Sequence, residues 1–88
     1  MPLSELASTR RVVGIRQVLR KIQLGQLQKL FLARDAAEER VMELLAEAER
    51  RNVAVEWCES MEMLGRASAI SRKAVAAGLV KGNLENIE

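Results

Sequence analysis

Residues 14–21 combine a glycine, a predicted helix start and regularly spaced cationic side chains. Arg16 and Arg20 are four residues apart, so they share one face of a helix. Gln17 and Lys21 form the neighbouring stripe, at the same spacing. Gly14 stands immediately before this segment's first apolar residue, where a glycine lets a ligand approach the backbone closely.

These residue types suit a polyanion. A helix start leaves free backbone N–H groups that attract phosphate. Arginine holds phosphate or the edge of guanine with a fork of donors, and glutamine can pair with adenine. A basic amphipathic helix that is simply solvated fits the same residues equally well, so on this segment alone both interpretations stand.

A second basic segment, residues 64–72, ends in Ile70, Ser71 and Arg72. A loop of this kind can rest the Ile70 side chain on an exposed base while Arg72 holds phosphate. The structural alternative is a plain connection in which Ile70 is part of the core and Arg72 is solvated.

The charges are sorted along the chain, although the net charge is only +2. Residues 6–34 contain seven basic residues and no acid, residues 35–62 contain nine acids and three arginines, and residues 63–84 contain four basic residues and no acid. A fold that joins the two basic segments at one edge of a sheet would present a cationic face to a polyanion. We expect the acidic segment to form the opposite, solvated side.

The composition argues against catalysis. The chain has no histidine, which is the commonest general base and metal ligand, and no phosphate-loop pattern of glycines with lysine. Cys58 has no histidine to activate it and is expected to be buried. We therefore predict no enzyme activity, no metal site and no cofactor.

The cysteine count and the hydropathy pattern predict where the protein works. A single cysteine excludes an internal disulfide and fits a reducing compartment. The first ten residues lack the apolar run of a signal peptide, and no stretch is long enough to span a bilayer. We predict a cytoplasmic protein without membrane contact, monomeric because its surface is highly charged.

Apolar periodicity predicts alternating helices and strands. The expected elements are a short helix over 2–7, an apolar stub at 11–13, a helix over 15–24, a strand over 30–33, a helix over 36–51 capped by Asp35, a strand over 53–58, a helix over 61–66 capped by Ser60, a loop over 67–73 and a strand over 74–80. Together they predict one α/β domain over residues 1–88, with helices on both faces of a small sheet, a core at about 11–81 and a frayed tail at 82–88.

Several short motifs, taken in order, resemble the kink-turn-binding ribosomal protein family, the L7Ae and L30e group. The resemblance covers roughly residues 12–80. It is carried by Gly14 before the basic helix, Arg34-Asp35-Ala36 after an apolar strand, Trp57-Cys58 at the end of the next strand, Ser60, Leu64-Gly65, the Ile70-Ser71-Arg72 loop, and a final strand of small residues.

The resemblance implies a three-layer α/β/α sandwich with a small four-stranded mixed sheet. It also implies that the glycine-led helix enters the widened groove of a kink-turn at its sheared G·A pairs, while the later loop covers a protruding nucleotide. Arg16 and Gln17 occupy positions that are Asn and Glu in archaeal members, and Arg20 occupies a lysine position. A basic residue followed by Gln resembles the short bacterial ribosome-associated members.

The sequence thus predicts a non-catalytic protein that binds kink-turn or kink-turn-like internal loops in ribosomal or regulatory RNA, with the ribosome as a candidate partner. The predicted RNA-binding residues are Gly14, Arg16, Gln17, Arg20, Lys21, Arg34, Ile70, Ser71 and Arg72. The alternative is a protein-interaction module on the same scaffold, which would use the acidic helix over 36–51. Acid-free segments at both matched positions favour RNA over this alternative.

Overall fold

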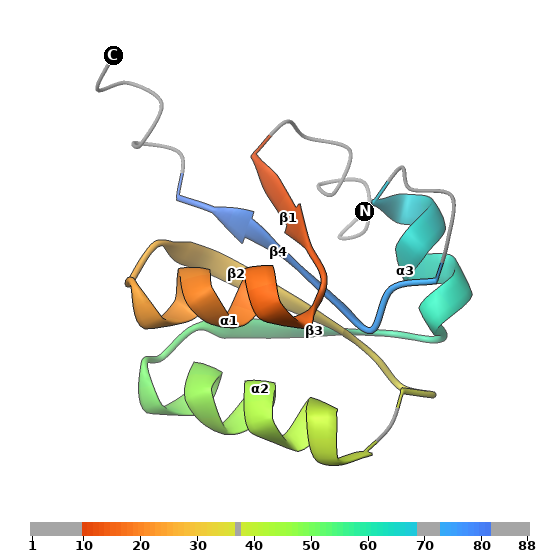
Figure 1. Ribbon diagram of the computed structural model, residues 1–88, viewed down its shortest axis with the longest axis horizontal. Helices are drawn as coiled ribbons and strands as arrows, with labels where there is room; N and C mark the ends of the chain where they lie inside the picture. Colours follow the sequence, from red (N-terminus) through yellow and green to blue (C-terminus); the bar gives the residue numbers. More distant parts are fainter. Residues whose placement is uncertain (1–9, 37, 69–72, 82–88) are drawn as a thin grey trace.

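The computed structural model describes residues 10–36, 38–68 and 73–81 of the 88-residue chain. The helix predicted over 2–7 and the tail predicted over 82–88 lie outside these ranges. Figure 1 shows the elements in chain order: β1 (Arg11–Val13), α1 (Ile15–Gln23), β2 (Leu27–Ala33), α2 (Glu38–Arg50), β3 (Ala54–Cys58), α3 (Met61–Ala67) and β4 (Ala76–Val80). Each described helix is too short or too polar to cross a lipid bilayer.

The strands form one mixed sheet in the order β1-β4-β2-β3. β4 pairs antiparallel with both β1 and β2, whereas β2 and β3 are parallel. β1, β2 and β3 therefore finish at the same end of the sheet, where β4 begins. We call this the Gly14 end, and the opposite end, where α1 and α2 finish, the far end.

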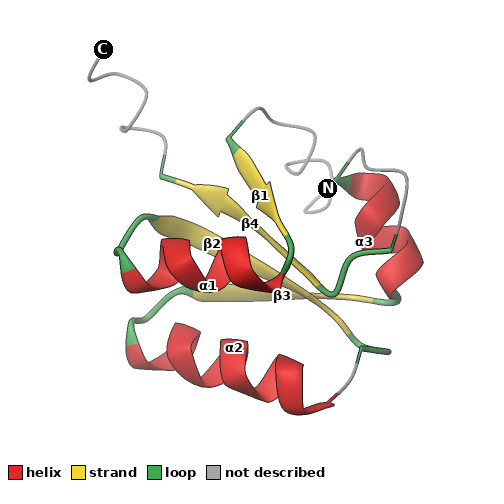
Figure 2. Ribbon diagram, in the orientation of Figure 1, coloured by secondary structure: helices red, strands yellow, loops and turns green. Residues whose placement is uncertain are grey.

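The helices cover the sheet in two layers, as Figure 2 shows. Val18 of α1 and Leu44 of α2 share a buried cluster with Leu30 of the sheet. Leu64 of α3 shares a second cluster with Phe31 on the other face. Residues that alternate along β2 thus enter opposite clusters, which is the pattern of a strand covered on both faces. The predicted three-layer α/β/α sandwich with a four-stranded mixed sheet is confirmed.

The acidic helix lies beside the basic one, and the expectation that it forms the opposite side is wrong. α1 leads from β1 towards β2, and α2 leads from β2 to β3, so both connections step the same way across the sheet. Connections of one handedness that step in one direction place their helices on the same face. α3 leads from β3 to β4, so this connection runs back across the sheet in the opposite direction. α3 lies on the other face of the sheet.

A bulge near the start of β2 makes the strand longer than predicted. The pairing with β4 shifts between Leu27 and Lys29, and this shift lets Leu27 join the cluster beneath α1 and α2. Gly78 lies against the bulge, and a Cβ there would come within 3.1 Å of the Lys29 carbonyl oxygen. Gly78 therefore leaves room for Leu27 and the Lys29 backbone where β2 begins, three residues before the predicted start.

The start of α2 also differs from the prediction. α2 begins at Glu38, and the Asp35 carboxylate accepts a hydrogen bond from the backbone N–H of Met61 at 2.8 Å. Asp35 thus helps to cap α3. The predicted cap of α3 by Ser60 is confirmed, because its hydroxyl accepts from the N–H of Met63 at 3.1 Å. The helix predicted over 15–24, the helix over 61–66 and the last two strands are confirmed to within two residues.

Candidate nucleic-acid interface

Gly14 fixes the start of α1 against the sheet. Its φ of 103° and ψ of 149° belong to a region that essentially only glycine occupies. Its N–H donates to the carbonyl oxygen of Ala76 at 2.9 Å, and its carbonyl oxygen accepts from the N–H of Val18 at 3.0 Å. A Cβ on Gly14 would meet no atom within 4 Å, so the demand for glycine is conformational and not steric.

The first turn of α1 is electrostatically open. No side chain caps it within the described part of the chain, and it contains no acid. The first backbone N–H groups of a helix have no intrahelical acceptor, and the helix dipole makes this end positive. The start of α1 is therefore suited to an anionic ligand.

Arg16, Gln17 and Arg20 are exposed along the outer face of α1, whereas Val18 and Ile22 are buried beneath it. The predicted shared face of Arg16 and Arg20 is present in the structure, and the three outer residues line a shallow hollow of about 340 Å³. No described residue forms an ion pair with either arginine. Both guanidinium groups are thus available to a ligand.

A second hollow, of about 450 Å³, lies between the starts of α1 and α2 and adds two residues that sequence reasoning missed. Arg40 and Glu43 line it together with Gly14, Arg16 and Gln17. Each precedes a buried residue of α2, Val41 or Leu44. Residues that flank the buried stripe of a helix lie at the border with the neighbouring helix. The spacing of the buried residues in α2 thus marks Arg40 as a border residue. It would have assigned Arg40 to this site once α1 was known to be the neighbouring helix.

Arg34 leaves β2 at the Gly14 end. Its N–H donates to the carbonyl oxygen of Cys58 at 2.9 Å, and its guanidinium carbon lies 5.6 Å from the centre of the Trp57 ring. The N–H of Ala33 donates to the carbonyl oxygen of Val75, just before β4. Arg34 is therefore held at the same end of the sheet as Gly14, stacked on a partly exposed indole.

Lys21 is turned away from the other predicted residues. Its Nζ donates to the side-chain oxygen of Gln26 at 3.2 Å, at the far end of α1. The lysine is half-buried there. The structure thus separates Lys21 from Gly14, Arg16 and Gln17.

Ile70, Ser71 and Arg72 lie outside the described residues. The chain on either side of them is anchored near the Gly14 end. The Ser68 hydroxyl donates to the carbonyl oxygen of Leu64 at 2.8 Å. The N–H of Ala74 donates to the carbonyl oxygen of Met61 at 3.0 Å. Their contribution to the interface stays a prediction.

The order of these elements matches a known family over almost the whole chain. The model of the Ribosomal protein L7Ae/L30e/S12e/Gadd45 family matches residues 3–87. This chain belongs to that family. The resemblance to the L7Ae and L30e group, drawn from the short motifs, is thereby confirmed.

Two bacterial proteins are similar to this chain over most of their length. RNA-binding protein TTE2299 of Caldanaerobacter subterraneus subsp. tengcongensis is 28% identical over 80 residues, which cover 91% of this chain and 98% of the relative. RNA-binding protein GWCH70_0105 of Geobacillus sp. (strain WCH70) is 29% identical over 76 residues, which cover 86% and 93%.

Solved structures share the architecture. A protein of unknown function from Bacillus halodurans C superposes with a TM-score of 0.81 at 25% identity, over 97% of this chain and 89% of that one. The Giardia lamblia 15.5kD RNA binding protein also superposes with a TM-score of 0.81, at 26% identity, over 97% of this chain and 73% of that one. Both likenesses agree with the α/β sandwich seen here.

Proposed function

We propose that this chain is a non-catalytic RNA-binding protein that recognises kink-turn or kink-turn-like internal loops. The observation that carries the proposal is a set of arginines around the start of α1, two from α1 itself and one from α2. Arg16, Arg20 and Arg40 have no ion pair with any described residue, and they adjoin an uncapped helix start. The relatives named as RNA-binding proteins support RNA as the polyanion. We call Gly14, Arg16, Gln17, Arg20 and Arg40 the α1 surface.

The α1 surface favours bent RNA over a regular duplex. A-form RNA has a deep, narrow major groove that side chains cannot read. An α-helix with its side chains is about 10–12 Å across, so the start of α1 needs a groove opened by a bend. Binding then stabilises the bent conformer by the difference in affinity between bent and extended RNA.

We assign different contacts to the side chains of this surface. A guanidinium only donates hydrogen bonds, so Arg16 and Arg20 suit phosphates or the acceptor edge of guanine. Gln17 both donates and accepts, and it is therefore our candidate for reading the edge of a base in the G·A pairs. Arg34 would hold the strand that passes the Gly14 end, and Ile70, Ser71 and Arg72 would cover the protruding nucleotide.

The position of Arg40 favours RNA binding over a protein-interaction role for the acidic helix. α2 contributes one arginine and Glu43 to the hollow beside Gly14, so part of this helix belongs to the α1 surface. Arg40, which pairs with no described residue, is suited at that border to an RNA phosphate.

The proposal extends to cellular context. We infer a single domain that acts as a cytoplasmic bacterial monomer on ribosomal or regulatory RNA, with the ribosome as candidate partner. The bacterial source of both sequence relatives supports this setting.

A gel-shift titration tests the proposal. A kink-turn RNA and a fully paired duplex of equal length are compared at about 100 mM salt, because phosphate contacts make every affinity salt-dependent. We expect the kink-turn to bind at least about tenfold more tightly, a difference of about 1.4 kcal/mol. A kink-turn whose G·A pairs are replaced by Watson–Crick pairs is the control and should behave as the duplex does. Equal affinity for all three RNAs would overturn the proposal.

A further inference from the structure

The far end of the molecule carries a third hollow, of about 310 Å³, that no part of the proposed function uses. It lies where α1 and α2 finish and where β4 leaves the sheet. Gly25, with φ 72°, and Asn52, with φ 59°, form the turns that border it. Arg51 and Lys81 line it with Gln28, and none of its lining residues is acidic.

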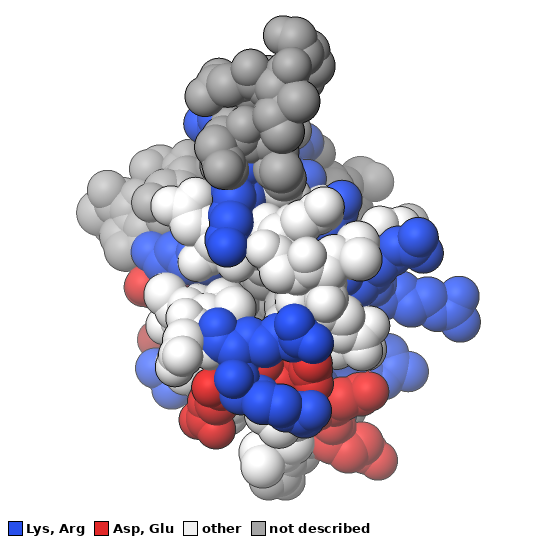
Figure 3. Space-filling view, turned by 90° about the vertical axis from the view of Figure 1, so that its left-hand side faces the viewer, with Lys and Arg blue, Asp and Glu red and all other residues white. Residues whose placement is uncertain are grey.

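Two cations from separate segments line this hollow, and a third, Lys21, is linked to one of them through Gln26. The N–H of Lys81 donates to the backbone oxygen of Gln26 at 2.9 Å, and Lys21 Nζ donates to the side-chain oxygen of the same glutamine at 3.2 Å. Lys21 and Lys81 thus flank Gln26, while Arg51 and Lys81 share the hollow. Figure 3 looks onto this end of the molecule and shows several Lys and Arg side chains on it, with Asp and Glu side chains beside the lower group. We call Lys21, Arg51 and Lys81 the far-end surface.

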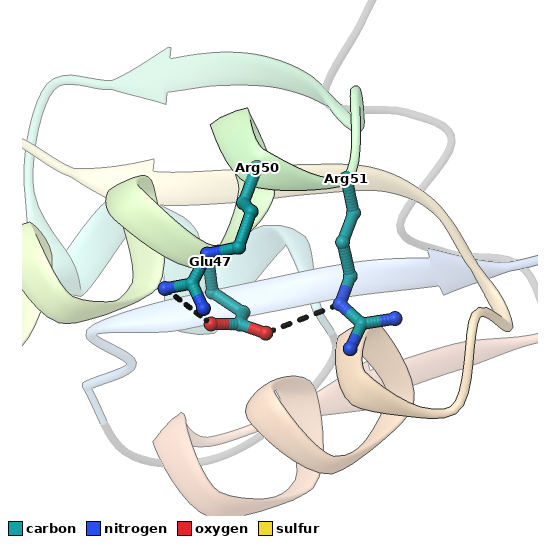
Figure 4. A network of polar contacts seen from close by, with 3 residues as sticks. All are labelled: Glu47, Arg50 and Arg51. Atoms are coloured by element: carbon teal, nitrogen blue, oxygen red, sulfur yellow. Dashed lines mark hydrogen bonds and ion pairs between the residues drawn. The ribbon is translucent and has the colours of Figure 1, made fainter.

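Glu47 orients Arg51 without neutralising the region. Its carboxylate lies 3.1 Å from Arg50 Nη2 and 3.1 Å from Arg51 Nε (Figure 4). Arg51 meets the carboxylate through Nε, as the dashed line in Figure 4 shows. Even with the exposed Glu49 counted beside Glu47, the three cations of the far-end surface leave a net charge of +1.

Helix dipoles explain part of this pattern but not all of it. Basic residues are stabilising at helix C-termini, which accounts for Lys21, Arg50 and Arg51. Lys81 follows a strand, so no helix dipole accounts for its place in the hollow. A hollow with cationic walls and no carboxylate among its lining residues is suited to an anion.

We infer that the far-end surface binds the sugar–phosphate backbone of an RNA duplex, in a contact independent of base sequence. Lysines act as point charges on phosphate, and the lining offers no aromatic ring on which a base could stack. This inference rests on the RNA-binding part of the proposed function, but not on recognition of a kink-turn. The phosphates come either from a stem of the RNA held by the α1 surface or from a second RNA.

The first experiment isolates the far-end surface. In an Arg16→Gln/Arg20→Gln background, fluorescence anisotropy measures binding of a 20-base-pair RNA duplex as a function of salt. Adding Arg51→Gln/Lys81→Gln should weaken this binding at least about tenfold and reduce the slope of log K against log salt by about 2, one for each lost phosphate contact. The control Arg50→Gln/Arg66→Gln removes the same charge outside the hollow and should change affinity less than about threefold.

Two outcomes of this experiment overturn the inference. One is an equal loss in the Arg51/Lys81 and Arg50/Arg66 variants, which would mean that only net charge matters. The other is no duplex binding at all in the Arg16→Gln/Arg20→Gln background. Neither outcome bears on kink-turn preference, which is measured with the unmodified protein, so failure here and failure of the proposed function are distinguishable. Thermal denaturation of each variant confirms that it is folded.

A second experiment identifies the source of the phosphates. The unmodified protein is titrated with two kink-turn RNAs that differ only in stem length. If a stem of the bound RNA reaches the far-end surface, Arg51→Gln/Lys81→Gln weakens binding of the long-stem RNA alone. If a second RNA binds, the two kink-turn RNAs have equal affinities. The complex of the protein with either one then binds a labelled duplex, and Arg51→Gln/Lys81→Gln abolishes this second binding. Absence of both effects overturns the inference.

Discussion

The two ends of α1 and α2 present cationic side chains in different surroundings. Near the starts of the helices, Arg16 and Arg40 have no ion pair with any described residue, and the uncapped start of α1 is positive. Near the helix ends, Arg50 and Arg51 share the Glu47 carboxylate, and the helix C-termini are negative. The cations near the helix starts are therefore available to a ligand, whereas Glu47 already pairs with two of those near the helix ends.

This difference shows why counting charges is a poor guide to a binding surface. A cationic side chain contributes more to ligand affinity when no carboxylate of its own protein already pairs with it. The α1 surface should therefore dominate RNA affinity, and the far-end surface should add a smaller, salt-sensitive contribution. Four sets of variants test this ranking.

The largest effect is expected from removing two cations of the α1 surface. Arg16→Gln/Arg20→Gln should reduce kink-turn affinity about 100-fold, since each arginine contact is worth about 1–3 kcal/mol. Stability should change by less than about 0.5 kcal/mol, because both side chains are exposed. Gel shift and urea denaturation measure the two quantities. Unchanged affinity would remove α1 from the interface.

The next effect concerns the two glycines that flank α1. Gly14→Ala forces a φ of 103° on an L-residue and should cost about 1–3 kcal/mol of stability. It should also lower kink-turn affinity about tenfold at temperatures where the protein is folded, because the helix start moves. Gly25→Ala, at φ 72°, is the matched control: it should cost stability and leave kink-turn affinity within about twofold. Equal affinity losses in both variants would contradict a special role for Gly14.

A smaller effect separates two arginines of the same helix. Arg40→Gln should weaken kink-turn binding about three- to tenfold, because Arg40 lines the hollow beside Gly14. Arg50→Gln removes the same charge from the other end of α2 and should change affinity less than about twofold. Isothermal titration of both variants measures the difference. If the two variants lose affinity equally, α2 contributes only through its overall charge.

The smallest effect concerns the carboxylate between Arg50 and Arg51. Glu47→Gln should cost at most about 1 kcal/mol of stability, because its partners are largely exposed. It should also raise duplex affinity at the far-end surface about two- to threefold, since one negative charge is lost there. Urea denaturation and duplex anisotropy give both values. Weaker duplex binding would mean that Glu47 is needed to hold Arg51 in place.

Much of the architecture could be read from local patterns. The helix at Ile15–Gln23 follows from apolar residues at helical spacing, and the cap of α3 follows from Ser60 directly before it. The start of β2 could not be read, because the bulge beside Leu27 depends on Gly78, which is far away in the sequence. The capping of α3 by Asp35 was missed for the same reason, since its partner Met61 is 26 residues away.

The sequence by itself determined most of the secondary structure, the outward face of Arg16 and Arg20, and the family. Only the tertiary structure decided which cations share a surface. It placed Arg40 beside Gly14, turned Lys21 towards Gln26 and brought Arg51 to Lys81. The physical reason is the order of the strands: β4 lies between β1 and β2 through long-range pairing, and the direction of each crossover then sets the face and neighbour of every helix.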